Sequence, residues 1–403
     1  MQKFQRFTGM QYLAIDIANK FGLDKQDWNI RLDWFNQNQE KLLSLVPQAK
    51  EPALFYAGVQ AWNQAQQGLP IGYPISLDAC SSGLQLLACL TGDDKAAKLC
   101  GVIDTGHRED AYSVIYNEMV NTISEKAKID REDCKDAILT SLYGSTAVPK
   151  RVFGEGKLLQ AFLDTMNNLA PAAWALNQVF LDIWDSTVLS HDWILPDNFH
   201  VHVNVMGTIK EKVQFFNKPY EVVTKVNMPK EKGRSLGANV THSIDGFLVR
   251  ELTRRCDYRP DVIAKIQGMI FNCWEKNELQ DTINNRMLET LWFHYLDSGY
   301  LSARILDYIT QDNISYIDRS VIQELIDSLP VKPFQVMSIH DCFRVLPNYG
   351  NDLREQYNLQ LMLIAKSNLL SFTLSQVMGR EIKVDKQNPN IWKEIKDSNY
   401  TLS

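Results

Sequence analysis

Three short segments of this sequence carry residue types that could handle a phosphorylated substrate and its counterions. The first centres on Asp78, which follows the apolar run Pro74–Leu77 and precedes a stretch of small residues, Ala79–Gly83. An aspartate at the end of a strand, with small neighbours, has room to bind a metal ion and a bulky ligand. Asp78 could equally be the N-cap of the helix expected after it, and the residues alone leave that alternative open.

The second segment, Arg131–Ser145, has the spacing of a helix with a cationic flank. At about 100° per residue, Lys135 lies about 40° around the helix from Arg131, and Tyr143 about 120°. Gly144 can end such a helix. The two cations could bind a triphosphate and the ring could stack on a base or sugar. The alternative is a solvated face on which Lys135 pairs with a nearby acid, Asp133 or Asp136.

The third segment, Gln335–Pro347, reads as two short strands with His340 and Asp341 at or near the tip of the hairpin. The pair could be polar residues of an ordinary turn. Taken with Asp78, however, it supplies a second carboxylate at a strand end. Two such carboxylates can hold two Mg²⁺ ions for phosphoryl transfer, and the cationic helix adds a triphosphate site. The combination indicates a nucleotidyltransferase.

The three segments resemble motifs A, B and C of the single-subunit DNA-directed RNA polymerases of phages and mitochondria. Arg131–Ser145 has every position of the motif B pattern R-x-x-x-K-x-x-x-x-T-x-x-Y-G-S, and in motif C Cys342 stands where the family usually has serine. The resemblance runs from about Met10 to the C-terminus. Shorter family-like pieces lie between and before the motifs, at Phe55–Gln60, Asp110–Tyr112 and Val240–Gly246.

The resemblance implies a role for each matching residue. Asp78 and Asp341 would bind two Mg²⁺ ions, and Arg131 and Lys135 would contact the phosphates of the incoming NTP, with Lys135 a candidate proton donor to pyrophosphate. Nucleotide binding would also involve Tyr143, Gly144, Tyr112 and His242. Tyr143 would close the nucleotide pocket, and together with Tyr112 and His242 it would sense the ribose. Two alternatives stay open: Tyr112 as a core-facing aromatic, and His242 as a histidine satisfied by Asp245.

The residues after the motif A and motif C aspartates favour ribonucleotides. DNA polymerases of family A carry a bulky glutamate where this chain has Gly83, and tend to have glutamate where it has Cys342. The predicted function is therefore RNA synthesis on a DNA template. A catalytically silent assembly subunit and a family A-like DNA polymerase or primase are the competing hypotheses.

Periodicity predicts an α+β fold, and the resemblance implies a right-hand polymerase palm, a small antiparallel sheet, with mostly helical fingers. The expected helices are 10–35, 85–99, 110–125, 131–142, 157–190 (with Pro171 a candidate break) and 353–378, and the expected strands are 73–78, 200–206, 220–226 and 335–346. The expected divisions are a helical N-terminal palm and fingers segment (1–70), palm motif A (71–100), fingers with the motif B helix (101–199), a specificity-hairpin-like segment with the His-Ser-x-Asp-Gly element (200–256), a helical insertion (257–333), and palm motif C with C-terminal helices (334–403).

Two regions outside the motifs could also bind partners. The lysine-rich segment Lys210–Arg234 falls where the family has its promoter-specificity hairpin, and could contact DNA or be a solvated hairpin. The expected insertion, which contains Trp274 and Trp292, is interpreted as a helical subdomain, with docking of a partner or accessory factor as a further hypothesis.

Composition leaves the function open. The net charge of −6 argues mildly against nucleic-acid binding as a whole, although one cleft can still be basic. The seven cysteines have no zinc-type spacing, and no apolar run is long enough to span a bilayer, so no membrane partner is expected.

The expected partners are DNA template, RNA product and NTPs. Only 77 residues precede Asp78, where the family has a long N-terminal half. We therefore expect a second polymerase subunit that supplies this half in a heterodimer, with accessory single-stranded-DNA or template-recruiting factors. The chain resembles the larger subunit of split phage enzymes, which predicts a location in the cytoplasm of an infected bacterial host.

Overall fold

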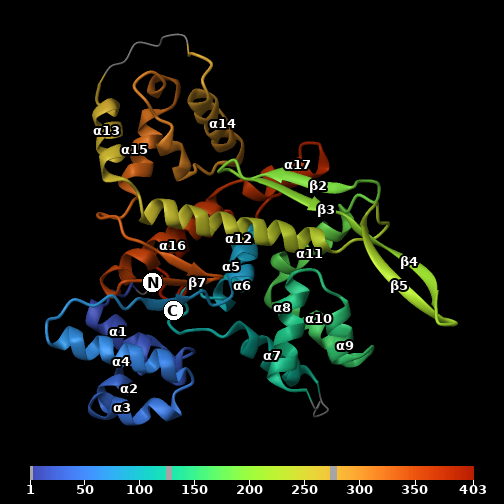
Figure 1. Cartoon of the computed structure of the whole chain (residues 1–403), viewed down its shortest axis with the longest axis horizontal. Coiled ribbons are helices and arrows are strands. Elements are labelled where there is room, and N and C mark those ends of the chain that lie inside the picture. Colours follow the sequence, from blue (N-terminus) through green and yellow to red (C-terminus); the bar gives the residue numbers. More distant parts are fainter. Residues whose placement is uncertain (1–2, 124–128, 273–278) are drawn as a thin grey trace.

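The computed structural model describes residues 3–123, 129–272 and 279–403, and it is an α+β structure in which helices surround small antiparallel sheets. The long helix α12 (Ser235–Cys256) crosses the middle of the molecule (Figure 1), and the described N-terminal residues contact the C-terminal segment, since Gln5 N donates to Asn399 Oδ1 (2.7 Å). The α+β prediction is therefore confirmed.

The N-terminal segment forms four α-helices instead of beginning with one long helix. Thr8 caps α1, and its side chain accepts a hydrogen bond from the backbone of Gln11. The expected helix 10–35 is wrong because a π-helical turn interrupts it, with Gly22 at a φ of 125° that other residues avoid. The helices are α1 (Gly9–Ala18), α2 (Trp28–Asn38), α3 (Leu42–Leu45) and α4 (Pro52–Gln66).

The central sheet has three antiparallel strands in the order β1–β7–β6. β1 (Ile75–Asp78) pairs with β7 (Cys342–Val345), which pairs in turn with β6 (Met337–Ile339). The sheet therefore joins residues from the two ends of the sequence. The turn between β6 and β7 consists of His340 and Asp341, and His340 has the positive φ (56°) that tight hairpins require.

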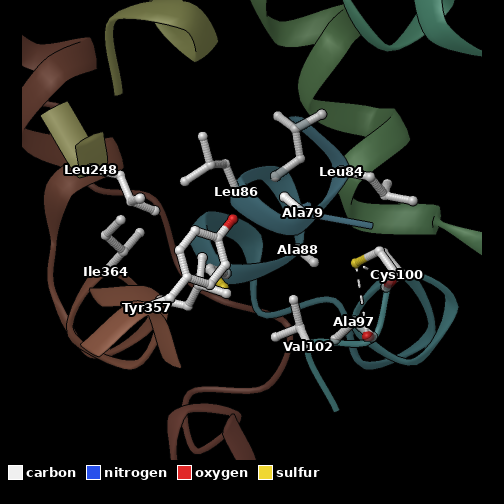
Figure 2. Packing of buried hydrophobic residues seen from close by; sticks show 14 of the residues in the cluster. Ala79, Leu84, Leu86, Ala88, Ala97, Cys100, Val102, Leu248, Tyr357 and Ile364 are labelled. Atoms are coloured by element: carbon white, nitrogen blue, oxygen red, sulfur yellow. Dashed lines mark hydrogen bonds between the residues drawn. The ribbon is translucent and has the colours of Figure 1, made fainter. Parts of the chain in front are cut away.

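The helix after β1 lies inside the core. α5 (Ser82–Thr91) is buried over all its residues from Gly83 onward, as its nearly unbroken apolar sequence predicts. Figure 2 shows side chains from α5, α12 and α16 (Gly350–Lys366) gathered in one cluster, with Leu86, Leu248 and Ile364 among them. This packing fixes the chain that follows Asp78 against two other helices.

The middle of the chain is helical, with breaks at the residues that disfavour a helix. The expected helix 85–99 is divided at Gly92 (φ 68°), and the break expected at Pro171 is confirmed. The expected helix 131–142 is confirmed, and the last two residues of the expected helix 110–125 lie outside the described residues. The helices are α6 (Asp94–Leu99), α7 (Ala111–Thr122), α8 (Arg131–Leu142), α9 (Ala147–Phe153), α10 (Lys157–Leu169) and α11 (Pro171–Asp182).

Two hairpins precede α12. The first pairs β2 (Ser190–Ile194) with β3 (His200–Asn204), so the prediction of helix as far as residue 190 is wrong. Its side chains alternate between buried and exposed, which is a strand pattern. The second pairs β4 (Met206–Phe215) with β5 (Lys218–Asn227) and extends away from the body (Figure 1).

The segment after α12 has a small core of its own. It contains α13 (Pro260–Ile270), α14 (Ile283–Ser298) and α15 (Arg319–Asp327), packed around buried apolar residues such as Leu288 and Ile322. Trp292 packs partly buried against this core, whereas Trp274 and Cys273 lie outside the described residues. The helical character predicted for this segment is therefore confirmed over its described part.

The C-terminal segment returns to the central sheet. The expected helix 353–378 is two helices, α16 and α17 (Leu369–Met378), and the short α18 (Trp392–Ile395) follows. The last residue pairs with the end of β1, since Ser403 N donates to Asp78 O (2.9 Å) and Asp78 N to Ser403 O (3.2 Å). No single helix among the described residues is long and apolar enough to cross a bilayer; only Pro347–Lys366 and Leu369–Met378 taken together, across a 57° bend, reach that length.

Candidate active site

The two aspartates singled out in the sequence lie at the same end of the central sheet. Asp78 is the last residue of β1 and pairs with Cys342 of β7. Cys342 directly follows Asp341, which lies at the tip of the β6–β7 hairpin. The backbone also joins these positions, because Ala79 N donates to Asp341 O (3.1 Å). Asp78 is not a helix cap, since the residue before α5 is Ser81. The sheet therefore brings together two carboxylates that are far apart in the sequence.

The electrostatics of this pair fit a cation site. Burial raises the pKa of Asp341, and the neighbouring charge of Asp78 raises it further. Burial also raises the pKa of Cys342 to about 12, and a hydrogen bond between this thiol and the carboxylate of Asp78 raises the pKa further. At neutral pH the thiol is therefore protonated and acts as a donor to Asp78. A cation between the two carboxylates would relieve their mutual repulsion.

The donor set suits a hard cation that completes its shell with other ligands. No group of three or more His, Cys, Asp or Glu side chains within 3–123, 129–272 and 279–403 is arranged to hold a metal ion. Mg²⁺ is commonly bound by only one or two carboxylates together with water and substrate phosphates. Asp78 and Asp341 are carboxylate donors of this kind.

The cations of α8 are engaged by local acids. Arg131 Nε donates to Ser113 Oγ (2.6 Å), and its guanidinium pairs with Asp110, the residue before α7. Lys135 Nζ lies 4.0 Å from Glu132, so the expected local pairing is present but with an acid other than Asp133 or Asp136. Lys135 Nζ also lies 5.9 Å from the centre of the Tyr112 ring. A phosphate ligand would therefore have to compete with these carboxylates.

Tyr143 and His242 contact each other and line an open cleft. Their ring centres are 4.7 Å apart, and the cleft, about 580 Å³ in volume, is also lined by Asp341 and His340. His242 is exposed and its ring contacts Tyr143 at an interplanar angle of 49°, so the reading of His242 as a histidine satisfied by Asp245 is not what the structure shows. Gly144 follows the helix with a φ of 83°, which ends α8 as expected.

Gly83 makes room for the Tyr143 hydroxyl. A Cβ atom at Gly83 would lie 2.4 Å from Tyr143 Oη, far closer than a real contact. A second cavity of about 240 Å³ lies beside this contact and is lined by Tyr112, Tyr143 and Asp341. Burial raises the pKa of Tyr143 to about 12, so the hydroxyl stays protonated. Glycine at this position therefore determines where the tyrosine lies.

Tyr112 joins the same cavity from α7. Its hydroxyl lies 3.5 Å from Ser81 Oγ, and its ring packs partly buried against the core. The core-facing reading of the ring thus holds in part, while the role of the hydroxyl in nucleotide binding stays a prediction. The structure brings five predicted residues to one end of the sheet: Asp78, Asp341, Tyr143, His242 and Tyr112.

Sequence reasoning missed Asp245 as a site residue. It lies one turn after His242 on α12 and lines the same cleft as Asp341. Burial and the charge of Asp341 raise the pKa of Asp245 to about 6, while a hydrogen bond with Ser82 acts in the opposite direction. The i, i+3 spacing from His242 was the available signal, since such residues share a helix face.

Most of the lysine-rich segment 210–234 lies in the projecting β4–β5 hairpin. None of its residues lines the cleft around Tyr143 and His242. In the pairing register, Ile209, Val213 and Phe215 lie on one face with Tyr220 and Val222, whereas the lysines at 210, 212 and 225 lie on the other. Both faces are largely exposed. DNA contact by this hairpin stays a prediction.

Comparison with known proteins finds a family that part of this chain resembles. The family model of the DNA-dependent RNA polymerases matches residues 5–186, a segment that includes Asp78 and Arg131–Ser145 but not His242 or Asp341. A probable DNA-directed RNA polymerase of Gelasinospora sp. is 24% identical over 390 residues, which is 88% of this chain and 42% of that protein. The resemblance drawn from the motifs is thereby confirmed.

Two further relatives are also fungal. A probable DNA-directed RNA polymerase of Neurospora crassa is 30% identical over 34% of this chain, and the mitochondrial DNA-directed RNA polymerase of Schizosaccharomyces pombe is 25% identical over 55%. The chain spans less than half the length of each of these relatives: 18%, 42% and 22%. The prediction of an infected bacterial host is wrong, because these relatives are fungal and include mitochondrial enzymes.

Proposed function

Since this chain is related to the DNA-dependent RNA polymerases over the segment that carries Asp78 and α8, we propose that it is a catalytic part of such an enzyme. Its reaction would join an NTP to the 3′ end of an RNA on a DNA template. The observation that carries the proposal is the meeting of Asp78 and Asp341, from distant parts of the sequence, beside a cleft lined by Tyr143 and His242.

Asp78 and Asp341 would hold the metal ions. When bound, two Mg²⁺ ions supply activation of the attacking hydroxyl and charge stabilisation at the leaving pyrophosphate. The protein's own part is to keep two carboxylates fixed at adjacent strand ends. Pairing of β1 with β7 and hydrogen bonding of the Cys342 thiol to Asp78 both support that arrangement.

Arg131 and Lys135 would bind the triphosphate. Both are held by carboxylates, Asp110 and Glu132, and neither pair is deeply buried. A triphosphate carries more negative charge than one carboxylate, so it can replace these acids as the partner of the two cations. Lys135 would then stand where it can donate a proton to the leaving pyrophosphate.

The sugar would lie against the contacting side chains of Tyr143 and His242, with Tyr112 close by and Gly144 at the end of α8. Hydroxyl and imidazole groups can hydrogen-bond to a ribose 2′-hydroxyl, and Gly83 has no side chain that would exclude it. This arrangement supports a preference for ribonucleotides over deoxyribonucleotides. The DNA polymerase or primase alternative predicts the opposite preference.

Template and product binding would require further surface. Most of the affinity for nucleic acid comes from contacts to backbone phosphates. A second subunit that supplies them, and template-recruiting factors, stay predictions, as does promoter contact by the β4–β5 hairpin. Co-expression and co-purification with candidate chains of the same source tests the heterodimer, which fails if the chain alone transcribes processively.

The decisive experiment is extension of an RNA primer annealed to a DNA template, with rNTPs and Mg²⁺. We expect Asp78→Asn and Asp341→Asn each to lower the rate about a thousandfold or more, since metal stabilisation of the transition state is worth several kcal/mol. Asp257→Asn is the matched control, because this aspartate is exposed at the far end of α12. No extension by the unmodified chain, even with a partner present, would favour the silent assembly subunit.

A further inference from the structure

Arg250 extends the row of α12 residues that faces the cleft. His242 and Gly246 both line the cleft, and Arg250 follows them at the same four-residue spacing. Residues four apart lie on the same face of a helix, one turn after another. Val249 also lines the cleft, so the cleft-facing surface of α12 reaches the turn that carries Arg250. The Arg250 side chain is 27% exposed and therefore accessible to a ligand.

A buried carboxylate holds the guanidinium of Arg250 in one orientation. Asp197 is buried and accepts hydrogen bonds from Arg250 Nε (2.7 Å) and Nη2 (3.2 Å), which is a two-point contact. The ring of Phe199 lies against the same guanidinium, with its centre 4.1 Å from Arg250 Cζ. Because the guanidinium is planar, these contacts together restrict its rotation.

The remaining guanidinium nitrogen of Arg250 lies beside the cleft. Nη1 donates to no group in the part of the chain that the structure describes. A Cβ atom at Gly246 would lie 3.4 Å from this nitrogen, so Nη1 approaches the backbone of a residue that lines the cleft. Glycine leaves that approach open because it has no side chain. Arg250 thus has N–H donors at the cleft that no protein group uses.

The charges around Asp197 leave an excess of positive charge. Arg254 also donates to Asp197 (2.9 Å) and pairs with Glu251, and the backbone carbonyl of Asp197 accepts a hydrogen bond from Arg304 (2.8 Å). Three arginines, Arg250 among them, therefore surround two carboxylates. Such an excess, next to a cleft, attracts anions.

The direction of α12 indicates which anion would lie there. The helix begins beside α11, where Gly237 approaches Phe180, and runs from there toward α13 (Figure 1). Passing from His242 to Arg250 therefore leads away from the side of the cleft where α8 would bind the triphosphate. Gly246 is four residues, about 6 Å along the helix axis, from His242. At about 3.4 Å per nucleotide this distance corresponds to about two nucleotides of a strand.

We propose that Arg250 binds a backbone phosphate of the RNA strand, about two nucleotides before its 3′ end, and so holds that end beside Asp78 and Asp341. The inference rests on the proposed function, because it names the growing RNA as the ligand. Asp197 is then the positioning residue that orients Arg250. A purely structural Arg250 would pair with Asp197 and make no contact with nucleic acid.

Binding of an RNA–DNA primer–template, followed by fluorescence anisotropy between about 50 and 200 mM salt, tests the contact without catalysis. We expect Arg250→Gln to weaken binding about tenfold and to lower the slope of log Kd against log salt by about one, as for one lost phosphate contact. Arg254→Gln is the matched control, because it also removes a partner of Asp197, and its salt slope should stay unchanged. An equal loss of slope in the two variants, or an unchanged slope in Arg250→Gln, would overturn the proposal.

A neutral methylphosphonate linkage in the RNA locates the phosphate and requires no change in the protein. Placed about two nucleotides from the 3′ end, it should weaken binding to the unmodified chain about tenfold and have no further effect on Arg250→Gln. Additive effects at every position of the RNA would overturn the proposal. Non-additivity confined to linkages of the DNA template would overturn the assignment to RNA and place the contact on the template.

Primer extension by the same variants separates this contact from the proposed function. We expect Arg250→Gln to raise the KM for primer–template about tenfold and to keep the KM for rNTP within about threefold. Non-additivity in binding but no extension by the unmodified chain would refute the proposed function and keep Arg250 as a phosphate-binding residue. Extension without non-additivity in binding would refute only the role of Arg250. Failure of the unmodified chain to bind the primer–template, with any co-purifying subunit retained, would refute both.

Discussion

Replacing Gly83 with alanine perturbs the site at the closest contact in the cleft. The new Cβ atom would lie 2.4 Å from Tyr143 Oη, 3.0 Å from Cζ and 3.4 Å from Cε1. Of these, only the last is an ordinary van der Waals distance. Because the tyrosine is partly exposed, its ring can move away from the methyl group more easily than the buried helix α5 can.

The geometry gives the size of the effect. Restoring a 3.4 Å contact at Oη requires a shift of about 1 Å, the difference between 3.4 and 2.4 Å. Overpacking of this kind costs about 1–3 kcal/mol. Alanine regains about 1 kcal/mol over glycine in a helix, so the net loss of stability is only about 0–2 kcal/mol. Displacement of a substrate-positioning group by about 1 Å can cost about a hundredfold in rate.

The assay compares unfolding by urea with kcat/KM for rNTP and dNTP in primer extension. We expect Gly83→Ala to lower kcat/KM for rNTP about a hundredfold and to reduce discrimination against dNTP. Tyr143→Phe is the matched background, since it removes the atom nearest to the new methyl group. In that background the additional effect of Gly83→Ala should fall to about tenfold or less, because the remaining ring atoms lie at 3.0 Å and beyond.

An equal loss from Gly83→Ala in the presence and absence of the Tyr143 hydroxyl would refute this reasoning. The effect of alanine would then arise from the backbone of α5 and not from the tyrosine. Wild-type activity with unchanged sugar preference in Gly83→Ala would also contradict it, because the ring would have moved without consequence for the nucleotide.

Three further changes test other contacts. Cys342→Ser keeps a donor to Asp78 and should change primer extension less than about threefold, whereas Cys342→Val leaves that carboxylate without its donor and should lower it by about tenfold. Asp110→Asn removes one of the two acids that pair with Arg131 and leaves Glu132 in place; the KM for NTP should fall as the guanidinium is held less tightly, and an unchanged KM would show that Asp110 does not compete with the nucleotide for Arg131. Asp197→Asn should lower the free energy of unfolding by about 3–5 kcal/mol at pH 7, and the difference from the unmodified chain should begin to shrink as the pH falls below about 3.8 and shrink further as the pH passes through the lower pKa of the folded state.

The direction of the last effect follows from the ion pairs of Asp197. Burial alone would raise the pKa of this carboxyl, but Arg250 and Arg254 outweigh it and hold the pKa below its ordinary value of 3.8. A depressed carboxyl pKa contributes stability that is complete above the unfolded-state pKa and is lost on acidification. Urea midpoints of the unmodified chain and of Asp197→Asn, measured between pH 3 and pH 7, test this pH dependence. A difference between the two midpoints that does not change with pH would contradict it.

The sequence was informative wherever a local pattern determines structure. The spacing of α8 predicted its bounds, and the strand-end positions of Asp78 and Asp341 followed from their apolar neighbours. Helices were joined wrongly across Gly22 and Gly92, because an apolar pattern continues through a glycine whose positive φ stops the helix. The strand β2 was missed for the related reason that its short alternating pattern follows directly on a helical one.

Contacts between distant segments could not be predicted in this way. Nothing local indicates that Arg131 pairs with Asp110, or that Tyr143 lies against Gly83. Both contacts depend on how α7, α8 and α5 pack. The place of Asp245 in the cleft was hidden similarly, because it lies near Ser82 and Asp341 only when α12 packs beside the start of α5 and the central sheet.

The two halves of α12 have different surroundings: the first half lies at the cleft, and the second half carries buried charged residues. His242 and Asp245 lie in its first half, at the cleft, whereas the fully buried Glu251 and Arg255 lie in its second half. Glu251 accepts hydrogen bonds from Ser302 and from the backbone of Ala303, both in the segment that follows the helix.

Buried charges of this kind are satisfied in only one arrangement, since removing a partner costs several kcal/mol. Arg255 adds to this by donating to Gln356 of α16 and to Ser328 near the end of α15. The 257–333 segment and α16 thus hold the far end of the helix rigidly. Because a rigid helix transmits that placement along its length, the position of His242 in the cleft depends on contacts made by Glu251 and Arg255, about two to four turns away.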